Sequence, residues 1–499
     1  MSEQRRKQFL RIFLFFVIGV LSIGGYILWS STAEGQGYPL DDAWIHQTYA
    51  RNLIQFGEWS FVPGTISGGS TAPLWSAVLA LGYGVGLSPF LWTSFLGVVM
   101  LLCLTIVCQE WLELRSPHFP MWFAFIGLIV LLEWHLVWAA LSGMETLALA
   151  LLAAFVLMLM DRNPEKFLLI GVFVGVGVWI RPDALLLVLP VGWSLITRYY
   201  PDWKDLVPKV LLFAAGLIAP VLLYLSFNLA ISGSIWPNTF YAKQAEYAVL
   251  IEIPLWTRIL DQMRMPLVGV GILLLPGLVV LVVDVVRSRS WERLAPVLWV
   301  LCYLLLYAYR LPVIYQHGRY AMPVIPAVIV LGLEGLAIMD DRSRTVPIRR
   351  ALSRAWGISI GVVLVIFWVL GGKAYMRDVA IIETEMVAAA KWIKKNTPDD
   401  ALIAGHDIGA LGYFGDRRIV DLAGLISPEV IPFIRDENAL AKFLDTQEAS
   451  YLLTFPDWYP ELIKHGDELY STFGVYSPEA GGSNMHIYRW KNDRLLLGD

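Results

Sequence analysis

The sequence predicts an α-helical protein that crosses a membrane many times and carries a small soluble α/β domain at its C-terminal end. Of its 499 residues, 57% are hydrophobic and only 16% are charged, which is less charge than soluble domains carry. Apolar runs approaching the roughly 20 residues that span a bilayer recur up to residue 372. From residue 373 onward the apolar runs become short and alternate with helical patterns, which indicates an α/β domain.

Twelve apolar runs are candidate transmembrane segments. The first run has no small-residue cleavage site and is long enough to span, so we expect a retained helix and not a cleaved signal peptide. The runs cover residues 9–29, 72–87, 89–109, 121–141, 144–160, 167–180, 184–197, 209–230, 267–286, 295–310, 321–339 and 356–372.

Basic residues orient the chain. Arg5, Arg6, Lys7 and Arg11 lie around the start of the first run, which places the N-terminus in the cytoplasm. Later basic residues gather in alternate loops, and this pattern places the C-terminal domain outside the cytoplasm. These two positions require an odd number of spans, so we expect about eleven to thirteen, with the short run 72–87 as a candidate re-entrant segment.

Two adjacent carboxylates, Asp41 and Asp42, stand in the first outer loop. The residues that follow, 42–56, place apolar side chains at helical spacing, which predicts an amphipathic helix in the membrane interface. His46 lies one turn after Asp42 on the same face, and Arg51 points the other way. The structural alternative is that one carboxylate caps this helix. Because a cap uses only one of them, the pair favours a functional site.

Glu145 and Arg181 lie at predicted outer membrane boundaries. A carboxylate at membrane depth costs about 2.5–3.5 kcal/mol on insertion scales, so Glu145 is expected to face the protein interior; its alternative role is a helix cap. Arg181 either binds phosphate or pairs with Asp183, two residues later.

Lys243 and Arg319 are basic residues on the outer side, where the positive-inside tendency does not require them. Lys243 follows Tyr241, and a lysine among aromatic residues suits an anionic headgroup, although it can also snorkel. Arg319 lies beside His317, and arginine binds phosphate in bidentate fashion. An interfacial anchor is the alternative for Arg319.

The chain divides into a transmembrane domain, 1–372, whose outer loop covers 30–71, and an extracytoplasmic α/β domain, 373–499. A helix is expected at 379–395. His406 and Asp407 follow the end of a predicted strand, a common place for a ligand site, although a lone His-Asp pair is more often structural. The basic residues are scattered over short loops, which excludes nucleic-acid binding. The 3 cysteines lie in apolar runs, which argues against disulfides or a cysteine metal site.

Several of these features together resemble a known family, the GT-C membrane glycosyltransferases that use polyprenyl-phosphate sugars. Within it, the chain is most similar to the bacterial branch that contains the mycobacterial terminal arabinofuranosyltransferases. The residues that carry the resemblance are Asp41-Asp42 with Tyr49-Ala50-Arg51-Asn52, Ser70-Thr71-Ala72-Pro73-Leu74-Trp75, Gly143-Met144-Glu145-Thr146, Arg181-Pro182-Asp183, Pro237-Asn238-Thr239-Phe240-Tyr241-Ala242-Lys243 and Gly318-Arg319-Tyr320.

The resemblance implies that an aspartate of the first outer loop is the catalytic base, that the donor binds at the membrane boundary and that transfer occurs outside the cytoplasm. A polyprenyl-phosphate leaving group requires cations as its charge develops. The base is assigned to Asp41 or Asp42, with Asp41 preferred. The predicted donor-binding residues are Lys243, Arg319, Tyr320, His317, Arg181, Tyr241 and Asn238, and the predicted acceptor-binding or orienting residues are His46, Glu145 and Arg51.

Direct displacement by an acceptor hydroxyl needs no covalent intermediate, so inversion at the anomeric carbon is expected. The two adjacent carboxylates repel each other, which either raises one pKa or attracts a divalent cation such as Mg²⁺, Mn²⁺ or Ca²⁺. The acceptor is a cell-envelope glycan, a lipid or a protein. Two other functions compete with this one, a transporter or flippase of lipid-linked sugars and a membrane-anchored binding protein.

Overall fold

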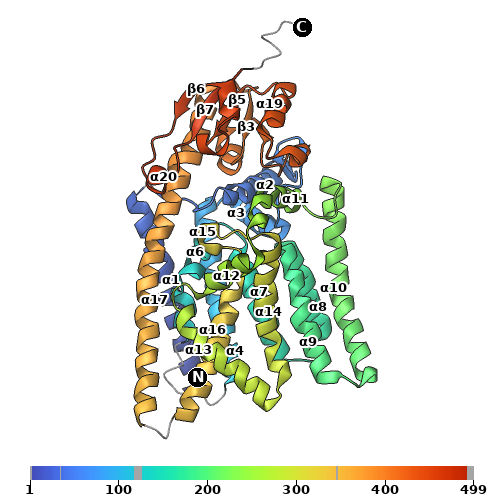
Figure 1. The fold of residues 1–499 in the computed structure, drawn as a ribbon, viewed down its shortest axis with the longest axis vertical. Coiled ribbons are helices and arrows are strands. Elements are labelled where there is room, and N and C mark those ends of the chain that lie inside the picture. Colours follow the sequence, from blue (N-terminus) through green and yellow to red (C-terminus); the bar gives the residue numbers. More distant parts are fainter. Residues whose placement is uncertain (1–2, 34, 117–125, 344–346, 492–499) are drawn as a thin grey trace.

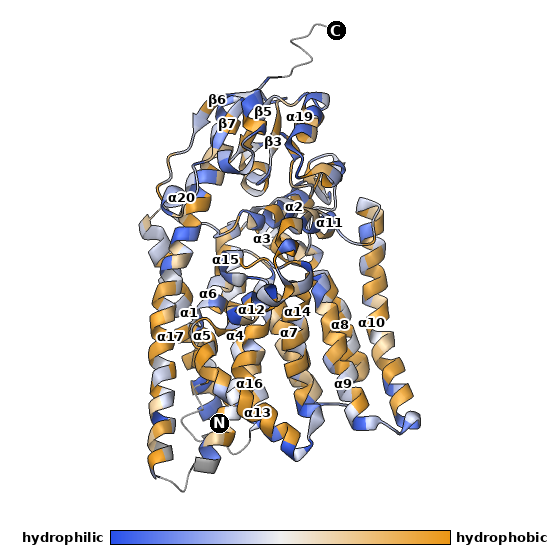
Figure 2. Cartoon of the chain, in the orientation of Figure 1, coloured by the Kyte–Doolittle hydropathy of each residue, from blue (hydrophilic) through white to orange (hydrophobic). Residues whose placement is uncertain are grey.

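The computed structural model describes residues 3–33, 35–116, 126–343 and 347–491. A bundle of long helices carries a small α/β domain, the tail domain, at the end of the bundle opposite the N-terminus (Figure 1). The helices of the bundle are mostly apolar, whereas polar residues gather in the tail domain and the loops (Figure 2). The predicted fold class, a polytopic helical membrane protein with a C-terminal α/β domain, is therefore confirmed.

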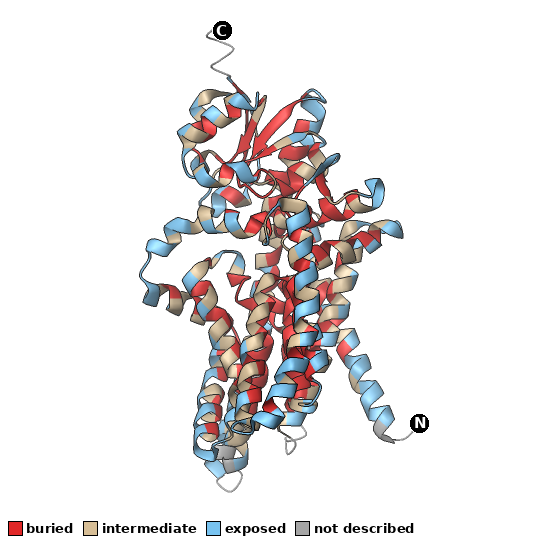
Figure 3. Ribbon diagram, turned by 90° about the vertical axis from the view of Figure 1, so that its right-hand side faces the viewer, coloured by how far each residue is buried: buried red, intermediate tan, exposed pale blue. Residues whose placement is uncertain are grey.

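Seven of the described helices are long and apolar enough to cross a membrane. Buried segments run along the middle of the bundle and continue into the tail domain (Figure 3). The seven are α1 (Glu3–Ala33), α4 (Pro89–Arg115), α10 (Trp203–Ser232), α13 (Gly271–Ser288), α14 (Ala295–Arg310), α16 (Ile325–Ser343) and α17 (Pro347–Ile382).

Shorter apolar helices accompany these seven in the bundle (Figure 1). The expected total of about eleven to thirteen spans includes them and stays a prediction. The predicted span 121–141 begins outside the described residues and continues as two short helices. The shorter helices are α3 (Pro73–Gly84), α5 (Gly127–Leu132), α6 (Trp134–Leu141), α7 (Thr146–Arg162), α8 (Phe167–Ile180) and α9 (Val188–Tyr199).

Glycines allow neighbouring helices of the bundle to approach closely. A Cβ at Gly171 on α8 would lie 2.2 Å from the carbonyl oxygen of Phe213 on α10, and one at Gly216 on α10 would lie 2.2 Å from that of Leu168. Small residues at such crossings are typical of membrane helices, because lipid supplies no hydrophobic drive for their association and close packing must hold them together.

Helix α17 continues into the tail domain without a break. A π-helical turn (Glu383–Val387) joins it to α18 (Ala388–Asn396). The sequence predicts two separate helices here, 356–372 and 379–395, which the structure joins into one continuous helical segment. Gly372 allows α17 to pack closely on α1, since a Cβ there would lie 2.0 Å from the ring of Trp29.

The tail domain contains a five-stranded sheet in the order β4-β3-β5-β7-β6. Strands β4, β3 and β5 are parallel, β7 pairs with β5 in antiparallel orientation, and the edge strand β6 is antiparallel to β7. The loops after β3 and β4 turn towards the bundle. The elements are β3 (Leu402–Gly405), β4 (Arg418–Asp421), α19 (Glu437–Thr446), β5 (Tyr451–Thr454), β6 (Gly466–Ser471), α20 (Tyr476–Glu479) and β7 (His486–Trp490).

Between the bundle and the tail domain lie α2 (Asp42–Phe56), the short hairpin β1 (Ser60–Val62) and β2 (Thr65–Ile66), and the helices α11 (Asn238–Glu246), α12 (Leu255–Arg264) and α15 (Tyr315–Gly318). Helix α2 has the predicted bounds but does not lie free on the membrane. Its apolar residues Ile45 and Tyr49 pack against Ile408, Ala423 and Leu425 of the tail domain and not against lipid. Gln47, on the predicted outer face, is only 1% exposed and donates to Tyr38 and Thr93 on the bundle side.

Candidate active site

A cavity of about 450 Å³, hereafter the first cavity, lies where the outer ends of the bundle helices meet the tail domain. This volume is typical of a small-molecule site. Its walls are largely apolar and come from α9, α11 and α14, with Leu425 of the tail domain above. The charged residues that line it are Asp42, Glu145, Arg181, Asp183, Lys243, Arg310 and Arg319.

Two glycines in left-handed conformation place charged residues at this cavity. Gly143 has φ +75°, and a Cβ there would lie 2.7 Å from the Cβ of Ala43, so the turn before α7 brings Glu145 against α2. Gly318 has φ +66° and follows Gln316 and His317, which are also left-handed. Two non-glycine residues in this region are strained, and such strain gathers at functional sites.

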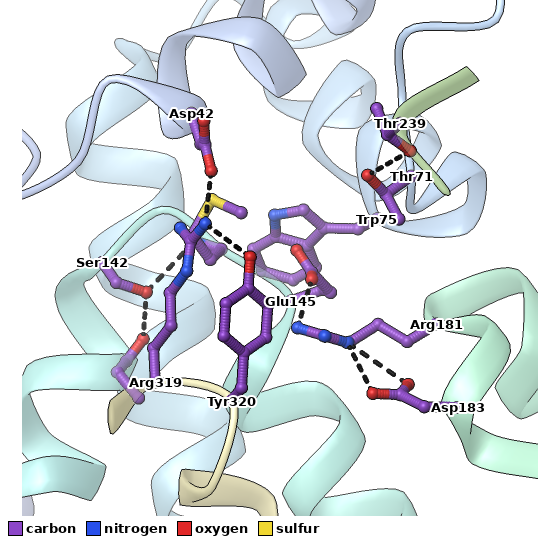
Figure 4. A network of polar contacts seen from close by, with 12 residues as sticks. Asp42, Thr71, Trp75, Ser142, Glu145, Arg181, Asp183, Thr239, Arg319 and Tyr320 are labelled. Atoms are coloured by element: carbon purple, nitrogen blue, oxygen red, sulfur yellow. Dashed lines mark hydrogen bonds and ion pairs between the residues drawn. The ribbon is translucent and has the colours of Figure 1, made fainter. Parts of the chain in front are cut away.

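Asp42 lies between two cations, Lys243 and Arg319, at the polar end of the first cavity. Figure 4 shows its contact with Arg319. Its Oδ2 accepts from Arg319 Nη2 at 2.6 Å and from Lys243 Nζ at 3.4 Å. Both cations also donate to the hydroxyl of Tyr320, at 3.1 and 3.2 Å. Burial alone would raise the pKa of Asp42, but Lys243 and Arg319 hold it below its usual value. Asp42 is therefore ionised at neutral pH.

Arg319 has two nitrogen atoms that can donate hydrogen bonds to a ligand. Its side chain is buried, yet Nε and Nη1 have no hydrogen-bond partner among the described residues. Unpaired donors of a buried guanidinium carry a desolvation cost. An anion in the first cavity would satisfy them and keep the contact with Asp42.

Arg181 belongs to a second, internally paired cluster. Its Nη1 donates to Glu145 Oε1 at 3.1 Å and its Nε to Asp183 Oδ2 at 3.2 Å. The hydroxyl of Tyr307 accepts from Nη2 at 2.6 Å and itself donates to Asp183. Arg181 thus makes the pairing with Asp183 that was the alternative to phosphate binding, although it also lines the cavity.

His46 connects these two clusters. Its Nε2 lies 3.5 Å from Glu145 Oε2, and its Nδ1 lies 2.9 Å from Ser76 Oγ. Both ring nitrogens are thus engaged, which fixes the imidazole beside Asp42 on the same face of α2. Glu145 precedes α7 but makes no capping hydrogen bond, so it faces the interior as expected.

Asp41 is turned away from the first cavity. Its Oδ2 accepts the backbone N–H of Gly409 at 2.6 Å, and its Oδ1 accepts that of Ala410 at 2.8 Å. Asp41 therefore fastens the tail domain to α2, and it makes no capping hydrogen bond. Burial and the neighbouring Asp407 raise its pKa to about 8. The geometry favours Asp42 over Asp41 as the carboxylate that meets a substrate, the reverse of the preference from sequence.

Three predicted donor-binding residues lie outside the first cavity, His317, Tyr241 and Asn238. His317 Nε2 contacts Asp378 Oδ2 at 2.8 Å on α17, and its ring packs edge-on against Trp134 and Trp138. Tyr241 is exposed on α11. The left-handed backbone at residues 316–318 turns His317 and Arg319 to opposite sides, which sequence spacing does not reveal.

Asn238 and Arg51 bind the tail domain through its backbone. Asn238 Nδ2 donates to the carbonyl of Leu425 at 3.3 Å. Arg51 Nη1 donates to the carbonyl of Tyr413 at 2.8 Å, and its guanidinium lies 4.9 Å from the centre of that ring. Both residues hold the tail domain against the bundle, and neither lines the first cavity.

Arg310 and Tyr307 line the cavity but were not singled out from the sequence. Arg310 ends α14 on the outer side, and its guanidinium lies over the ring of Phe240. The argument applied to Arg319, that an outer-side arginine is not required by the positive-inside tendency, would have found Arg310 as well. Tyr307 carries no such signal, because a tyrosine near a helix end is common at membrane interfaces.

A divalent cation does not fit well between Asp41 and Asp42. Both oxygens of Asp41 already accept backbone N–H groups, and Asp42 Oδ2 is already balanced by Lys243 and Arg319. Within the described residues, no group of three or more His, Cys, Asp or Glu side chains could hold a metal ion.

Two solved structures superpose on nearly the whole chain. ArnT from Cupriavidus metallidurans, bound to undecaprenyl phosphate, is 14% identical with a TM-score of 0.54, over 95% of this chain and 97% of ArnT. The oligosaccharyltransferase from Archaeoglobus fulgidus, in complex with Zn and sulfate, is 12% identical with a TM-score of 0.61, over 95% of this chain and 72% of the enzyme. The chain has the GT-C fold. The resemblance stated from the sequence is thereby confirmed at the level of the fold.

A third solved structure and a family model match parts of the chain. The mycobacterial arabinofuranosyltransferase AftD is 14% identical with a TM-score of 0.47, over 94% of this chain and 41% of AftD. That likeness carries no argument, so the arabinofuranosyltransferase branch stays a prediction. Residues 377–488 match a family model described as a domain of unknown function, DUF8728. No curated protein matches the sequence.

Proposed function

We propose that this GT-C protein transfers a sugar from a polyprenyl-phosphate donor to an acceptor hydroxyl on the extracytoplasmic side of the membrane. The observation that carries the proposal is the position of Asp42 against Lys243 and Arg319 at the polar end of a largely apolar cavity. A polyprenyl-phosphate sugar has the same division into an apolar chain, an anionic phosphate and a polar sugar. ArnT, whose structure holds undecaprenyl phosphate, supports this donor class.

Lys243 and Arg319 are suited to the phosphate of such a donor. As the bond between the anomeric carbon and the phosphate oxygen breaks, its electron pair passes to that oxygen and negative charge develops there. Fixed cations at this position stabilise the developing charge, because they need no reorganisation during the reaction. The unpaired Nε and Nη1 of Arg319 add two donors that already lie in the cavity.

Asp42 is suited to accept the proton of the attacking hydroxyl. Both cations contact its Oδ2, and among the described residues Oδ1 takes part in no hydrogen bond or ion pair. A carboxylate of low pKa is a weak base, which suffices when the hydroxyl becomes acidic late, after the leaving group has begun to depart. The acceptor oxygen attacks from the face opposite the phosphate, so the anomeric configuration inverts.

The experiment that tests this function measures sugar transfer by the purified protein in detergent, with a panel of radiolabelled polyprenyl-phosphate sugars and membrane extracts as acceptor. We expect one donor to be consumed, and Asp42→Asn to lower the rate by about 10³-fold or more, as expected when a general base is lost. Asp399→Asn is the matched control, because that side chain is fully exposed in the tail domain.

A separate arm measures binding of the donor part alone. We expect Lys243→Gln and Arg319→Gln each to weaken binding of polyprenyl phosphate by about 10- to 100-fold, since each removes a charge-assisted contact. A protein that consumes no donor, binds polyprenyl phosphate and moves lipid-linked sugars across vesicles equally well as Asp42→Asn would be a transporter instead.

A further inference from the structure

A second cavity, of about 720 Å³, opens between α2, α11 and the tail domain. It contains Asp42, Lys243 and Arg319, which also line the first cavity. The two cavities therefore meet at the carboxylate to which the proposed function assigns the attacking hydroxyl. The first cavity has mostly apolar walls, whereas the second is lined largely by polar and aromatic side chains.

The tail domain supplies the outer wall of the second cavity. His406 and Asp407 follow strand β3, and Trp458 and Tyr459 follow strand β5. His406 Nδ1 contacts the hydroxyl of Tyr459 at 2.7 Å, and its Nε2 lies 3.3 Å from Oε1 of Glu246 on α11. Contacts from both domains thus fix the His406 ring at the cavity wall.

Asp407 has an unsatisfied oxygen in this wall. Its Oδ2 is buried and has no hydrogen-bond partner among the described residues. A buried carboxylate oxygen without a donor is costly in a folded protein, and in native structures such a group calls for an explanation. A ligand that donates a hydrogen bond inside the second cavity would supply that donor.

Two large aromatic side chains lie at the second cavity and remain open to solvent. Trp458 is 48% exposed and Tyr315 is 55% exposed. The ring of Trp458 packs edge-on against His406, with 5.1 Å between centroids and 80° between planes. Phe455 packs against the same indole, with 5.0 Å between centroids, and the exposed part of the ring remains available for stacking.

The charge of the second cavity selects the class of ligand. Five carboxylates line it, Asp41, Asp42, Glu246, Asp407 and Glu437. Asp41 is protonated at neutral pH, because its pKa is raised to about 8. The other four face three permanent cations, Lys243, Arg319 and Arg435, and His406, whose pKa Tyr459 and Glu246 raise above its usual value against the effect of burial. The charges therefore nearly balance, and a neutral ligand whose hydroxyl groups donate to the carboxylates suits the cavity.

We propose that the second cavity is the acceptor site and that it binds the terminal sugars of a neutral glycan. In this arrangement a sugar stacks on Trp458, a hydroxyl donates to Asp407, and the reacting hydroxyl reaches Asp42. The inference rests on the proposed function, which it extends by assigning the acceptor class and the task of the tail domain.

Lipid and protein acceptors fit this cavity less well. An acyl chain would find charged and solvent-exposed walls at Glu437, Arg435 and Trp458, whereas the apolar walls belong to the first cavity. A phosphorylated lipid headgroup would find no excess of cations in the second cavity, because the charges there nearly balance. A peptide is an outcome of the test below.

The test is saturation-transfer NMR of neutral trisaccharides of arabinose, mannose, galactose and glucose with the purified full-length protein in detergent. We expect at least one trisaccharide to bind, and Trp458→Ala and Asp407→Asn each to weaken its binding by about tenfold or more, because stacking and a buried hydrogen bond are lost. Phe473→Ala is the matched control, since Phe473 is 83% exposed on the tail domain and lies outside the cavity.

The proposal is overturned if no trisaccharide binds at concentrations up to about 20 mM, if Trp458→Ala binds as well as the parent protein, or if a neutral hexapeptide library binds in place of the sugars. Failure of the proposed function has a different signature. In that case polyprenyl phosphate binds equally well to Lys243→Gln and Arg319→Gln, whatever the trisaccharides do. Trp458→Ala should leave polyprenyl phosphate binding unchanged, which separates the two sites.

Discussion

At the scale of single residues, two adjacent aspartates have different tasks because a helix begins between them. Asp41 precedes α2 and turns both oxygens to the backbone of the tail domain, at Gly409 and Ala410. Asp42 is the first residue of the helix, about 100° further round, and meets Lys243. Asp41 therefore holds the two domains together, and Asp42 is available to act as the proposed general base.

Asp407 gives the reaction a pH dependence. Burial raises its pKa to about 6; His406 opposes this shift, and Asp42, Glu246 and Asp421 add to it. Above that pKa it is ionised and accepts a hydroxyl, so we expect acceptor affinity to increase from pH 5 to pH 7 with a midpoint of about 6. Trisaccharide binding measured across this range should show the midpoint in the parent protein.

The control for this pH dependence is Asp407→Asn, which should bind more weakly and lose the midpoint. Asp42 stays ionised over this range because its pKa lies below its usual value, and Asp41 titrates at about 8. A midpoint that survives in Asp407→Asn would assign the titration to another group.

Chelation tests whether the adjacent aspartates use a metal. Because Asp41 is occupied by backbone N–H groups and Asp42 by two cations, we expect excess EDTA to change the transfer rate by less than about twofold. The measurement is transfer before and after EDTA, followed by addition of Mg²⁺, Mn²⁺ or Ca²⁺. Loss of activity that one of these ions restores would instead place a divalent cation at the site.

At the scale of elements, the segment after β3 docks the tail domain onto α2. A Cβ at Gly409 would lie 2.0 Å from the backbone oxygen of Asp41, and one at Gly412 would lie 2.2 Å from the ring of Phe61. Trp44 of α2 packs on Tyr413, with 4.7 Å between centroids. This contact also fixes the loop that carries His406 and Asp407, so docking and the second cavity depend on the same few residues.

Gly409→Ala should loosen this docking. The added methyl group has no room, and overpacking of this kind costs about 1–3 kcal/mol. We expect a lower thermal unfolding temperature, faster cleavage of the tail domain by protease and weaker trisaccharide binding, with polyprenyl phosphate binding retained.

Gly192→Ala on α9 is the control for Gly409→Ala, because a Cβ there meets no atom within 4 Å. We expect Gly192→Ala to behave like the parent protein. If Gly409→Ala also unfolds at the same temperature as the parent protein and is cleaved at the same rate, the close contact with Asp41 does not hold the tail domain.

At the scale of the whole molecule, both proposed binding sites lie at the same end of the bundle. The tail domain lies at the end opposite the N-terminus (Figure 1), and both cavities are lined by residues of the bundle and of this domain. A donor that stays in the bilayer and an acceptor that stays in water can then meet at Asp42 without either leaving its solvent.

Orientation in the membrane can be measured with single cysteines. In a variant with Cys103, Cys108 and Cys302 replaced by Ser, we expect Lys442→Cys to react with a membrane-impermeant maleimide in right-side-out vesicles. Gln8→Cys should react only after permeabilisation, because the basic residues near it keep the N-terminus in the cytoplasm. Both positions are exposed in the structure. The opposite labelling pattern would invert the topology and place the reaction in the cytoplasm.

The sequence by itself determined the fold class, the orientation that the basic residues favour and most charged residues of the first cavity. These follow from local signals, since apolar runs of bilayer length, outer-side basic residues and carboxylates at membrane boundaries need no tertiary information. Lys243, Arg319, Tyr320, Glu145 and His46 were found in this way, and they lie together in the structure.

Only the tertiary structure decided which of these side chains face a cavity and which hold the two domains together. Which of two adjacent aspartates faces the cavity depends on the backbone of Gly409, 368 residues away. The side to which His317 points depends on left-handed backbone at residues 316–318. The second cavity exists because the tail domain rests on α2, and its walls come from loops that no local pattern connects. Contacts between distant segments are set by packing of the whole chain, so they cannot be read from the periodicity of any single segment.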